Sequence, residues 1–203
     1  MKKQKPVLLI IFLIFYQCFI YFIAKFTPFE MNLLASKIDG AIPFVPWFIF
    51  FYVLWYLMLF LVPFTFYKYD SEKFYEYFLS CMISITICGI IYFVFPTFIV
   101  RDSININGIS TFLVDLIYKM DTPALNCLPS MHCLICFLFI IYCNLSAKIP
   151  NRYKYVINAL SVLVVLSTLF VKQHILIDVI SSLIISILIS VVVNKKLKNV
   201  FVK

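Results

Sequence analysis

Long apolar runs separated by short polar segments dominate the pattern along this chain. Six runs stand out, with approximate limits at 7–23, 47–66, 78–100, 131–145, 156–171 and 175–193. About 20 mainly apolar residues are enough to cross the hydrocarbon core of a bilayer as a helix. The pattern therefore predicts an all-α, polytopic membrane protein with six transmembrane helices.

The first run follows a basic N-terminus, so it has to be distinguished from a signal peptide. It is long for a signal-peptide core, and no small-x-small cleavage site follows it, which favours an uncleaved first span. Six spans take about 120 of the 203 residues and leave only short connections. We therefore expect residues 1–203 to form a single membrane domain.

One polar connection, before the fourth run, has a helical pattern of its own. Apolar residues recur at helical spacing through it, at Ile109, Phe112, Leu113, Leu116 and Ile117. Thr111, Asp115 and Lys119 share another face of the same helix. This pattern predicts a short amphipathic helix lying in the membrane interface.

Composition and charge agree with a membrane protein. Apolar residues make up 64% of the chain, against about half in ordinary globular proteins. The net charge of +8 comes from basic residues between the apolar runs, so we interpret it as a topology signal and not as a nucleic-acid surface. The abundant Lys, Ile, Asn and Phe indicate an AT-rich, bacterial genome, and hence a bacterial plasma membrane.

The basic residues divide unequally between the two sides that six spans create. Twelve of the 17 fall on the side of the termini: Lys2, Lys3, Lys5, Lys68, Lys73, Lys148, Arg152, Lys154, Lys195, Lys196, Lys198 and Lys203. The other five are Lys25, Lys37, Arg101, Lys119 and Lys172. Because the cytoplasmic side retains lysine and arginine, both termini are predicted to be cytoplasmic.

The seven cysteines show no zinc-ligand spacing, and their number is odd. Most lie inside the apolar runs, so we interpret them as small apolar residues. Cys127, in the connection before the fourth run, is predicted to be the most exposed of them.

The candidate chemistry lies at the external ends of the spans. The chain has only two histidines, His132 at the start of the fourth span and His174 at the start of the sixth. Arg101 ends the third span, and Asp178 lies about one turn inside the sixth. Each could be a boundary residue when taken alone. An intramembrane carboxylate is costly, however, and the set together indicates a functional site.

These residue types suit phosphoester chemistry. Asp178 is four residues after His174, so it can hold one imidazole nitrogen and leave the other free as a nucleophile. Ser130 lies just before a helix N-terminus that suits an anion, and Arg101 and Lys172 add positive charge for phosphate oxygens. His132 is then placed to protonate the leaving oxygen. No carboxylate cluster suggests a divalent metal site.

The motif Pro129-Ser130-Met131-His132, followed about forty residues later by His174 and Asp178, resembles the type-2 phosphatidic acid phosphatase superfamily. The resemblance implies a six-helix membrane core and metal-independent catalysis. It implies that His174 is the nucleophile that forms a phosphohistidine, that Asp178 orients it and that His132 is the general acid. Ser130 would contribute to the phosphate pocket.

The chain differs from the family at two motifs. The first motif of the family is a lysine, six residues and Arg-Pro, whereas Val94 takes the lysine position here and Asp102 follows Arg101. In the third motif Thr168 replaces an arginine, and Lys172 offers a charge from another place. These differences are similar to the branch of inositol-phosphoryl-ceramide synthase-like proteins, which transfer a phosphoryl head group between lipids.

The sequence thus predicts an enzyme without a cofactor that hydrolyses a lipid phosphate, such as phosphatidic acid or a prenyl phosphate or diphosphate, on the external membrane face. A lipid phosphotransferase that passes the phosphoryl group to an alcohol is the nearest alternative. Two others stay open. One is a haem-binding membrane protein that uses both histidines as axial ligands, and the other is a non-enzymatic lipid transporter.

Overall fold

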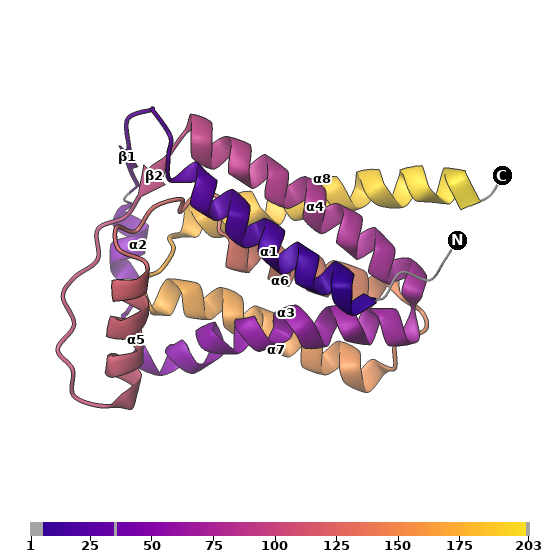
Figure 1. Cartoon of the computed structure of the whole chain (residues 1–203). Coiled ribbons are helices and arrows are strands. Elements are labelled where there is room, and N and C mark those ends of the chain that lie inside the picture. The colour runs from indigo at the N-terminus through magenta and orange to yellow at the C-terminus, as the bar shows by residue number, and fades with distance from the viewer. Residues whose placement is uncertain (1–5, 35, 202–203) are drawn as a thin grey trace.

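Helices build almost the whole molecule. The computed structural model describes residues 6–34 and 36–201. Six helices form a bundle (Figure 1): α1 Pro6–Ala24, α3 Ile49–Tyr69, α4 Ser71–Val94, α6 Met131–Leu145, α7 Asn151–Phe170 and α8 Leu176–Phe201. α1 begins and α8 ends at one end of the bundle, and the long connections gather at the other end (Figure 1).

Five of these helices are long and apolar enough to cross a membrane. They are α1, α4, α7, most of α8, and α3 with the short helix η1, Pro46–Phe48, that precedes it. Large apolar side chains point outward from them, including Phe15, Leu57 and Leu188. Length, composition and this apolar exterior indicate a membrane-embedded protein.

The sixth apolar helix, α6, is shorter. Its 15 residues span about 22 Å at 1.5 Å per residue, less than the hydrocarbon thickness of about 30 Å. It lies at the centre of the bundle, packed against α4, α7 and α8, and Leu134, Leu138, Phe139 and Tyr142 on it are fully buried. A short central helix whose neighbours extend further leaves space above its N-terminus.

The predicted limits of the third apolar run are wrong at both ends. Residues 78–100 were predicted, whereas α4 begins earlier, at Ser71, and ends at Val94. Asp70 caps its first turn by accepting from the Lys73 backbone N–H at 3.4 Å. Pro96 follows the end of the helix and disfavours helical geometry at the residue before it. The chain then extends as the strand β2, Thr97–Phe98.

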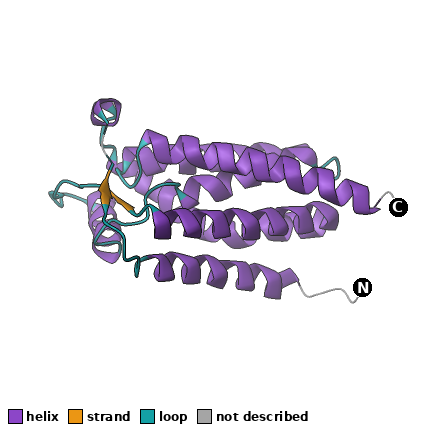
Figure 2. Ribbon diagram, turned by 90° about the horizontal axis from the view of Figure 1, so that it is seen from above, coloured by secondary structure: helices purple, strands orange, loops and turns teal. Residues whose placement is uncertain are grey.

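A short parallel pair of strands, which the sequence did not predict, ties the connections together. β1, Asn32–Leu33, pairs with β2, and the loop that carries β1 also contains the short helix α2, Lys37–Ala41. Figure 2 shows the strands among the loops at one end of the helices. In the next connection, Asn126 and Leu128 donate their backbone N–H groups to Thr97. The loops before α3, after α4 and before α6 therefore form one layer.

The helix α5, Ile109–Met120, lies in this layer and covers the predicted amphipathic segment. It runs across the end of the bundle, not along it (Figures 1 and 2). Val114 is buried against η1 and α3, whereas Ile109, Phe112, Leu116 and Met120 are exposed. Its position at a membrane surface stays a prediction.

The opposite end of the bundle carries most of the described basic residues. There Lys73 contacts both Glu76 and Asn194, and Lys148 contacts Asp70. These contacts bring the α3–α4 turn, the α6–α7 turn and the C-terminal part of α8 together. The grouping of basic residues in the sequence placed these three segments on one side. Lys2, Lys3, Lys5 and Lys203 lie outside the described residues.

Candidate functional site

A cavity of about 290 Å³ lies above the N-terminus of α6. α1, α3, α4, α5, α6 and the loop layer all contribute to its wall. Aromatic side chains form much of the lining: Tyr21, Tyr52, Trp55, Tyr56 and Tyr92. His132, His174 and Arg101 line the same cavity, so the structure brings together three residues that lie far apart in the sequence.

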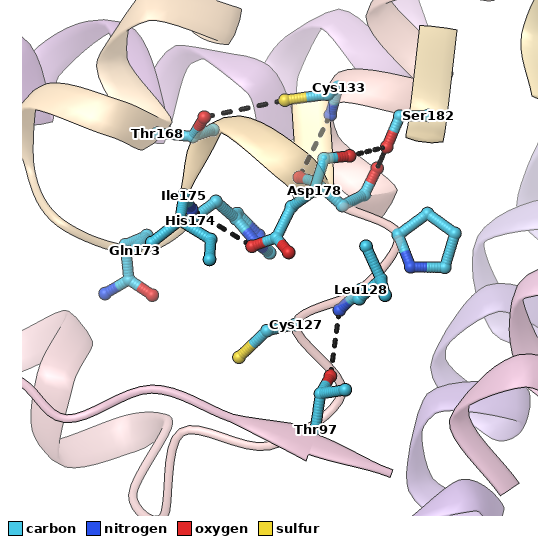
Figure 3. Close-up of polar contacts among 12 residues, drawn as sticks. Thr97, Cys127, Leu128, Cys133, Thr168, Gln173, His174, Ile175, Asp178 and Ser182 are labelled. Carbon is cyan, nitrogen blue, oxygen red and sulfur yellow. Dashed lines mark hydrogen bonds and ion pairs between the residues drawn. The ribbon is translucent and has the colours of Figure 1, made fainter. Parts of the chain in front are cut away.

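The His174–Asp178 pair has the geometry that the i+4 spacing predicts. His174 Nδ1 lies 3.1 Å from Asp178 Oδ2, and this oxygen also accepts the Ile175 backbone N–H at 3.0 Å. Figure 3 shows the carboxylate beside the imidazole. Asp178 is fully buried, and the His174 side chain is 11% exposed. The carboxylate fixes the ring through Nδ1, which leaves Nε2 as the available nitrogen.

A tight turn between α7 and α8 positions His174. Lys172 has φ of 54°, the left-handed conformation that often ends a helix. The backbone N–H groups of Gln173 and His174 both donate to the Thr168 carbonyl, at 2.9 and 3.1 Å. Asp39, from α2, caps α8 by accepting the Leu176 N–H at 2.8 Å. Helix ends and caps on both sides thus hold the nucleophile candidate in place.

His132 occupies the second position of α6 and faces three aromatic rings. The ring centroids of Tyr52 and Trp55 lie 4.5 and 4.1 Å from that of His132, and Tyr56 stands edge-on at 6.3 Å. The centroid of His174 is 6.0 Å away. The aromatic rings enclose the imidazole, and no carboxylate of the described residues forms a hydrogen bond or ion pair with it.

Ser130 lies beneath the cavity and does not line it. It is fully buried and caps α6, because its Oγ accepts the Cys133 N–H at 3.4 Å. Its carbonyl accepts from Ser182 Oγ at 2.8 Å, and its backbone N–H donates to the Asp178 carbonyl at 3.3 Å. Ser130 therefore joins the helix of His132 to the helix of Asp178.

Arg101 enters the cavity from the loop after β2. Its guanidinium donates to the Asp121 carboxylate at 2.7 Å and to Gln173 Oε1 at 2.6 Å. It also lies over the Tyr118 ring, 4.8 Å from the centroid. The side chain is 8% exposed, so this positive charge is held in a fixed place in the cavity that both histidines line.

Lys172 does not join this group. Its ammonium donates to the backbone carbonyls of Asp39 and Ile42 and lines a different hollow on the loop side. Thr168, at the position where the resembled family has arginine, is buried and donates its hydroxyl to the Val165 carbonyl. Arg101 is consequently the cationic side chain of the cavity among the described residues.

Buried polar atoms without a partner collect around this cavity. Among the described residues, seven buried side-chain nitrogen or oxygen atoms have no hydrogen-bond partner in the protein. Five of them belong to cavity-lining residues or to Asp178: Trp55 Nε1, Arg101 Nε, His132 Nε2, Gln173 Nε2 and Asp178 Oδ1. Such atoms are costly, and their concentration at one place indicates a site that binds a polar ligand.

The prediction for the cysteines is wrong in one respect. Cys127 is 2% exposed, and burial, reinforced by the Asp178 charge, raises the pKa of its thiol to about 12. It therefore stays protonated at neutral pH and is a poor nucleophile. Cys18, on α1, is instead exposed.

The cavity reaches the outer surface between α1, α3 and α5. Three of its lining residues are exposed there, namely Cys18, Tyr56 at 48% and Met120 at 74%. Tyr52 and Tyr56 are three and seven residues into α3, so His132 lies about 5 to 10 Å below the start of that helix. The histidines are thus recessed and reached from the side of the bundle.

Sequence reasoning missed Asp121, Gln173 and the aromatic wall. Asp121 is one of only nine acidic residues and directly follows α5, and Gln173 adjoins His174, so both had a weak signal. The aromatic residues had no such signal, because 19% of the chain is aromatic.

Comparisons with protein-family models, curated proteins and solved structures each found no match. In the described part of the chain, no three His, Cys, Asp or Glu side chains gather as metal ligands.

Proposed function

We propose that the protein is a membrane enzyme that removes the phosphoryl group from a lipid phosphate through a phosphohistidine. The observation that carries this proposal is the pair of histidines, 6.0 Å apart, in an aromatic cavity that also holds Arg101. One histidine is bound to a buried carboxylate, and the other is surrounded by aromatic rings. Two imidazoles in different surroundings suit different roles.

In the first step His174 Nε2 attacks phosphorus while the bond to the lipid oxygen breaks. Asp178 holds the Nδ1 proton and stabilises the positive charge that develops on the ring. The negative charge of the bound phosphate favours the protonated form of His132, which gives its proton to the departing lipid alcohol. The products are a lipid alcohol and phosphohistidine 174.

In the second step water attacks the phosphohistidine. The P–N bond breaks, a P–O bond forms, and neutral His132 takes the proton from water. Inorganic phosphate leaves, and both histidines return to their starting protonation states. Each step uses groups that already surround the cavity.

Arg101 is the proposed partner of the phosphate oxygens. A guanidinium binds phosphate in a bidentate manner, and Arg101 Nε has no partner among the described residues. Asp121 holds one face of this guanidinium, so an incoming phosphate competes with a carboxylate already in place. Ser130 acts from beneath by positioning His132, and Lys172 by shaping the turn before His174.

A lipid substrate is supported by the side opening of the cavity. In the proposed arrangement α6 is a sixth, short span, and the loop layer with α5 lies at the external membrane surface. The exposed residues Ile109, Phe112, Leu116 and Met120 give α5 an apolar outer face for the interface. The phosphate then meets the histidines while the chain of the lipid lies between α1 and α3.

The orientation can be tested separately from the chemistry. A reporter fused after Lys203 should behave as cytoplasmic, because the basic residues gather at that end of the bundle. An external signal would reverse the proposed orientation and place the site on the cytoplasmic face.

The function itself is tested with purified protein in detergent and labelled lipid phosphates, including phosphatidic acid and a prenyl phosphate. The unmodified protein should release phosphate in EDTA, and His174→Ala should not. Release by His174→Ala at the unmodified rate would refute the proposal. Rates with several soluble phosphate esters then show how much the rate of phosphate release depends on the lipid chain.

Two other functions remain distinguishable. Haem binding by His132 and His174 would give a visible absorption band in purified protein and would leave Arg101 and Asp178 without a role. A lipid transporter would move a labelled lipid across vesicles without releasing phosphate.

A further inference from the structure

Gln173, the residue before His174, has a buried amide group of which only one end is engaged. The residue is 2% exposed and lines the aromatic cavity together with His174. Its Oε1 accepts from the Arg101 guanidinium at 2.6 Å, whereas its Nε2 has no hydrogen-bond partner within residues 6–34 and 36–201. A buried donor without a partner destabilises a fold, and this one lies in the wall of the proposed site.

Arg101 determines which end of the Gln173 amide is left free. A guanidinium only donates hydrogen bonds, so the oxygen of the amide has to face it. The flipped amide would place two donor groups against each other, which excludes the exchange of oxygen and nitrogen that amides otherwise permit. The free atom of Gln173 is therefore Nε2, a donor, and it belongs to the same amide group that contacts Arg101.

The turn that positions His174 also fixes the backbone of Gln173. The Gln173 backbone N–H donates to the Thr168 carbonyl at 2.9 Å, and the same carbonyl accepts from His174 at 3.1 Å. Figure 3 shows Gln173 and His174 side by side at this turn. A donor with little freedom of movement can hold a substrate in a defined position relative to the nucleophile.

The unpartnered atoms of the cavity wall indicate what kind of ligand fits them. Trp55 Nε1, Arg101 Nε and Gln173 Nε2 all carry hydrogens that they can only donate. The ligand must consequently offer several acceptor atoms, and the charge of Arg101 favours an anion. A phosphate group has non-bridging oxygens for more than one of these donors. Because an amide is neutral, Gln173 adds a donor without adding a further charge.

On the basis of the proposed function, we propose that Gln173 is a phosphate-binding residue whose Nε2 donates to a non-bridging oxygen of the substrate. Arg101 Nε donates to a second oxygen of the same phosphate. The contact between the two side chains keeps both donors in place before the substrate arrives, so neither has to reorganise when His174 attacks phosphorus. Arg101 supplies the charge of this clamp, and Gln173 supplies a neutral donor.

The most direct test follows the Gln173 amide itself in the unmodified full-length protein. The chain has only three glutamines, Gln4, Gln17 and Gln173, so ¹⁵N labelling of glutamine side chains gives three NH₂ signals. The Gln173→Met variant identifies the signal of Gln173. On titration of the labelled protein with inorganic phosphate in detergent, this signal should shift and reach saturation. Gln17, which lines the same cavity from α1, is the internal control, and its signal should stay in place.

A double-variant cycle separates a direct contact from an effect through Arg101. Equilibrium dialysis with labelled inorganic phosphate measures the dissociation constant. Gln173→Met keeps the length of the side chain and should weaken phosphate binding about tenfold, the effect of one lost hydrogen bond to a charged ligand. In the background of Arg101→Met, Gln173→Met should weaken binding again, by about threefold or more. The matched control Gln17→Met should change binding by less than about twofold.

Two results would overturn the assignment. One is a Gln173 signal that does not move at any phosphate concentration, and this result decides the matter even if a variant fails to fold. The other is an unchanged dissociation constant when Gln173→Met is added to Arg101→Met, because Gln173 would then act only by positioning Arg101. If the Gln173 signal shifts but no lipid or soluble ester is hydrolysed, the phosphate contact stands and the proposed phosphatase activity is refuted.

Discussion

The two ends of the bundle treat their buried polar groups in opposite ways. At the end where α1 begins and α8 ends, Asp70 accepts from Ser146 Oγ at 2.7 Å and contacts Lys148 at 3.5 Å. Glu76, only 1% exposed, pairs with Lys73 at 2.6 Å. Every one of these acidic groups has a partner, so this end is a polar clasp between turns.

At the loop end the polar atoms are just as buried but incompletely paired. One carboxylate oxygen of Asp178 contacts His174. The other oxygen and Arg101 Nε have no hydrogen-bond partner among the described residues. A fold stabilised only by packing gains nothing from such atoms, which each cost about 1 to 3 kcal/mol. The contrast indicates that the clasp holds the bundle together and that the loop end is built for a ligand.

The largest expected effect comes from the two histidines. With a natural lipid phosphate, His174→Ala and His132→Ala should each lower kcat by about 100-fold to 10,000-fold or more. The first variant lacks the nucleophile, and the second lacks the general acid. With a nitrophenyl phosphate, whose leaving group needs no proton, His132→Ala should still form phosphohistidine 174 and release a burst of nitrophenol, before the attack of water, which lacks its base, limits turnover. His174→Ala should give no burst. Rapid-mixing kinetics on the nitrophenyl phosphate and steady-state kinetics on both substrates measure these effects.

A burst of nitrophenol from neither variant would contradict this division of roles. A burst from His174→Ala and not from His132→Ala would reverse it. Thermal denaturation of each variant in detergent provides the control for folding.

The next effect compares one isosteric change at each end of the bundle. Asp178→Asn removes the charge behind His174, so kcat should fall about 100-fold or more while the melting temperature holds or rises, since a buried, half-paired carboxylate is lost. Asp70→Asn weakens the clasp, so stability should fall by about 1 to 3 kcal/mol with kcat within about twofold. The opposite pattern at either position would break the comparison.

The smallest effect concerns the exposed face of α5. Phe112→Ser together with Leu116→Ser should reduce kcat/KM on lipid phosphates by about 3-fold to 10-fold, because two apolar side chains leave the proposed interface. A short soluble phosphate ester should be turned over at nearly the unmodified rate. Equal losses on both substrates would assign these residues to folding and not to the membrane.

The sequence predicted the helices better than their surroundings. The run 131–145 coincides with α6, and the i+4 spacing of His174 and Asp178 gave their contact, because both depend on local periodicity. The end of α4 at Val94 was missed, since apolar residues continue into β2 and only Pro96 marks the break. Hydropathy cannot separate an apolar strand from the last turn of an apolar helix.

The rest of the site depends on contacts between distant segments. Asp121 and Gln173 reach Arg101 only because the loop layer folds over the end of the bundle. Lys172 looked like a phosphate ligand from its charge and position, but its ammonium binds the carbonyls of Asp39 and Ile42, more than 100 residues earlier. No local pattern encodes either arrangement.

If His174 carries the phosphoryl group during turnover, the phosphohistidine can be trapped and located. Unmodified protein is mixed with lipid carrying labelled phosphate, quenched rapidly without acid, digested and mapped by mass spectrometry. We expect a base-stable, acid-labile phosphate on the peptide that contains His174, and this phosphate should be retained in His132→Ala with a nitrophenyl phosphate as donor. Label on His132, or turnover without any labelled histidine, would contradict it.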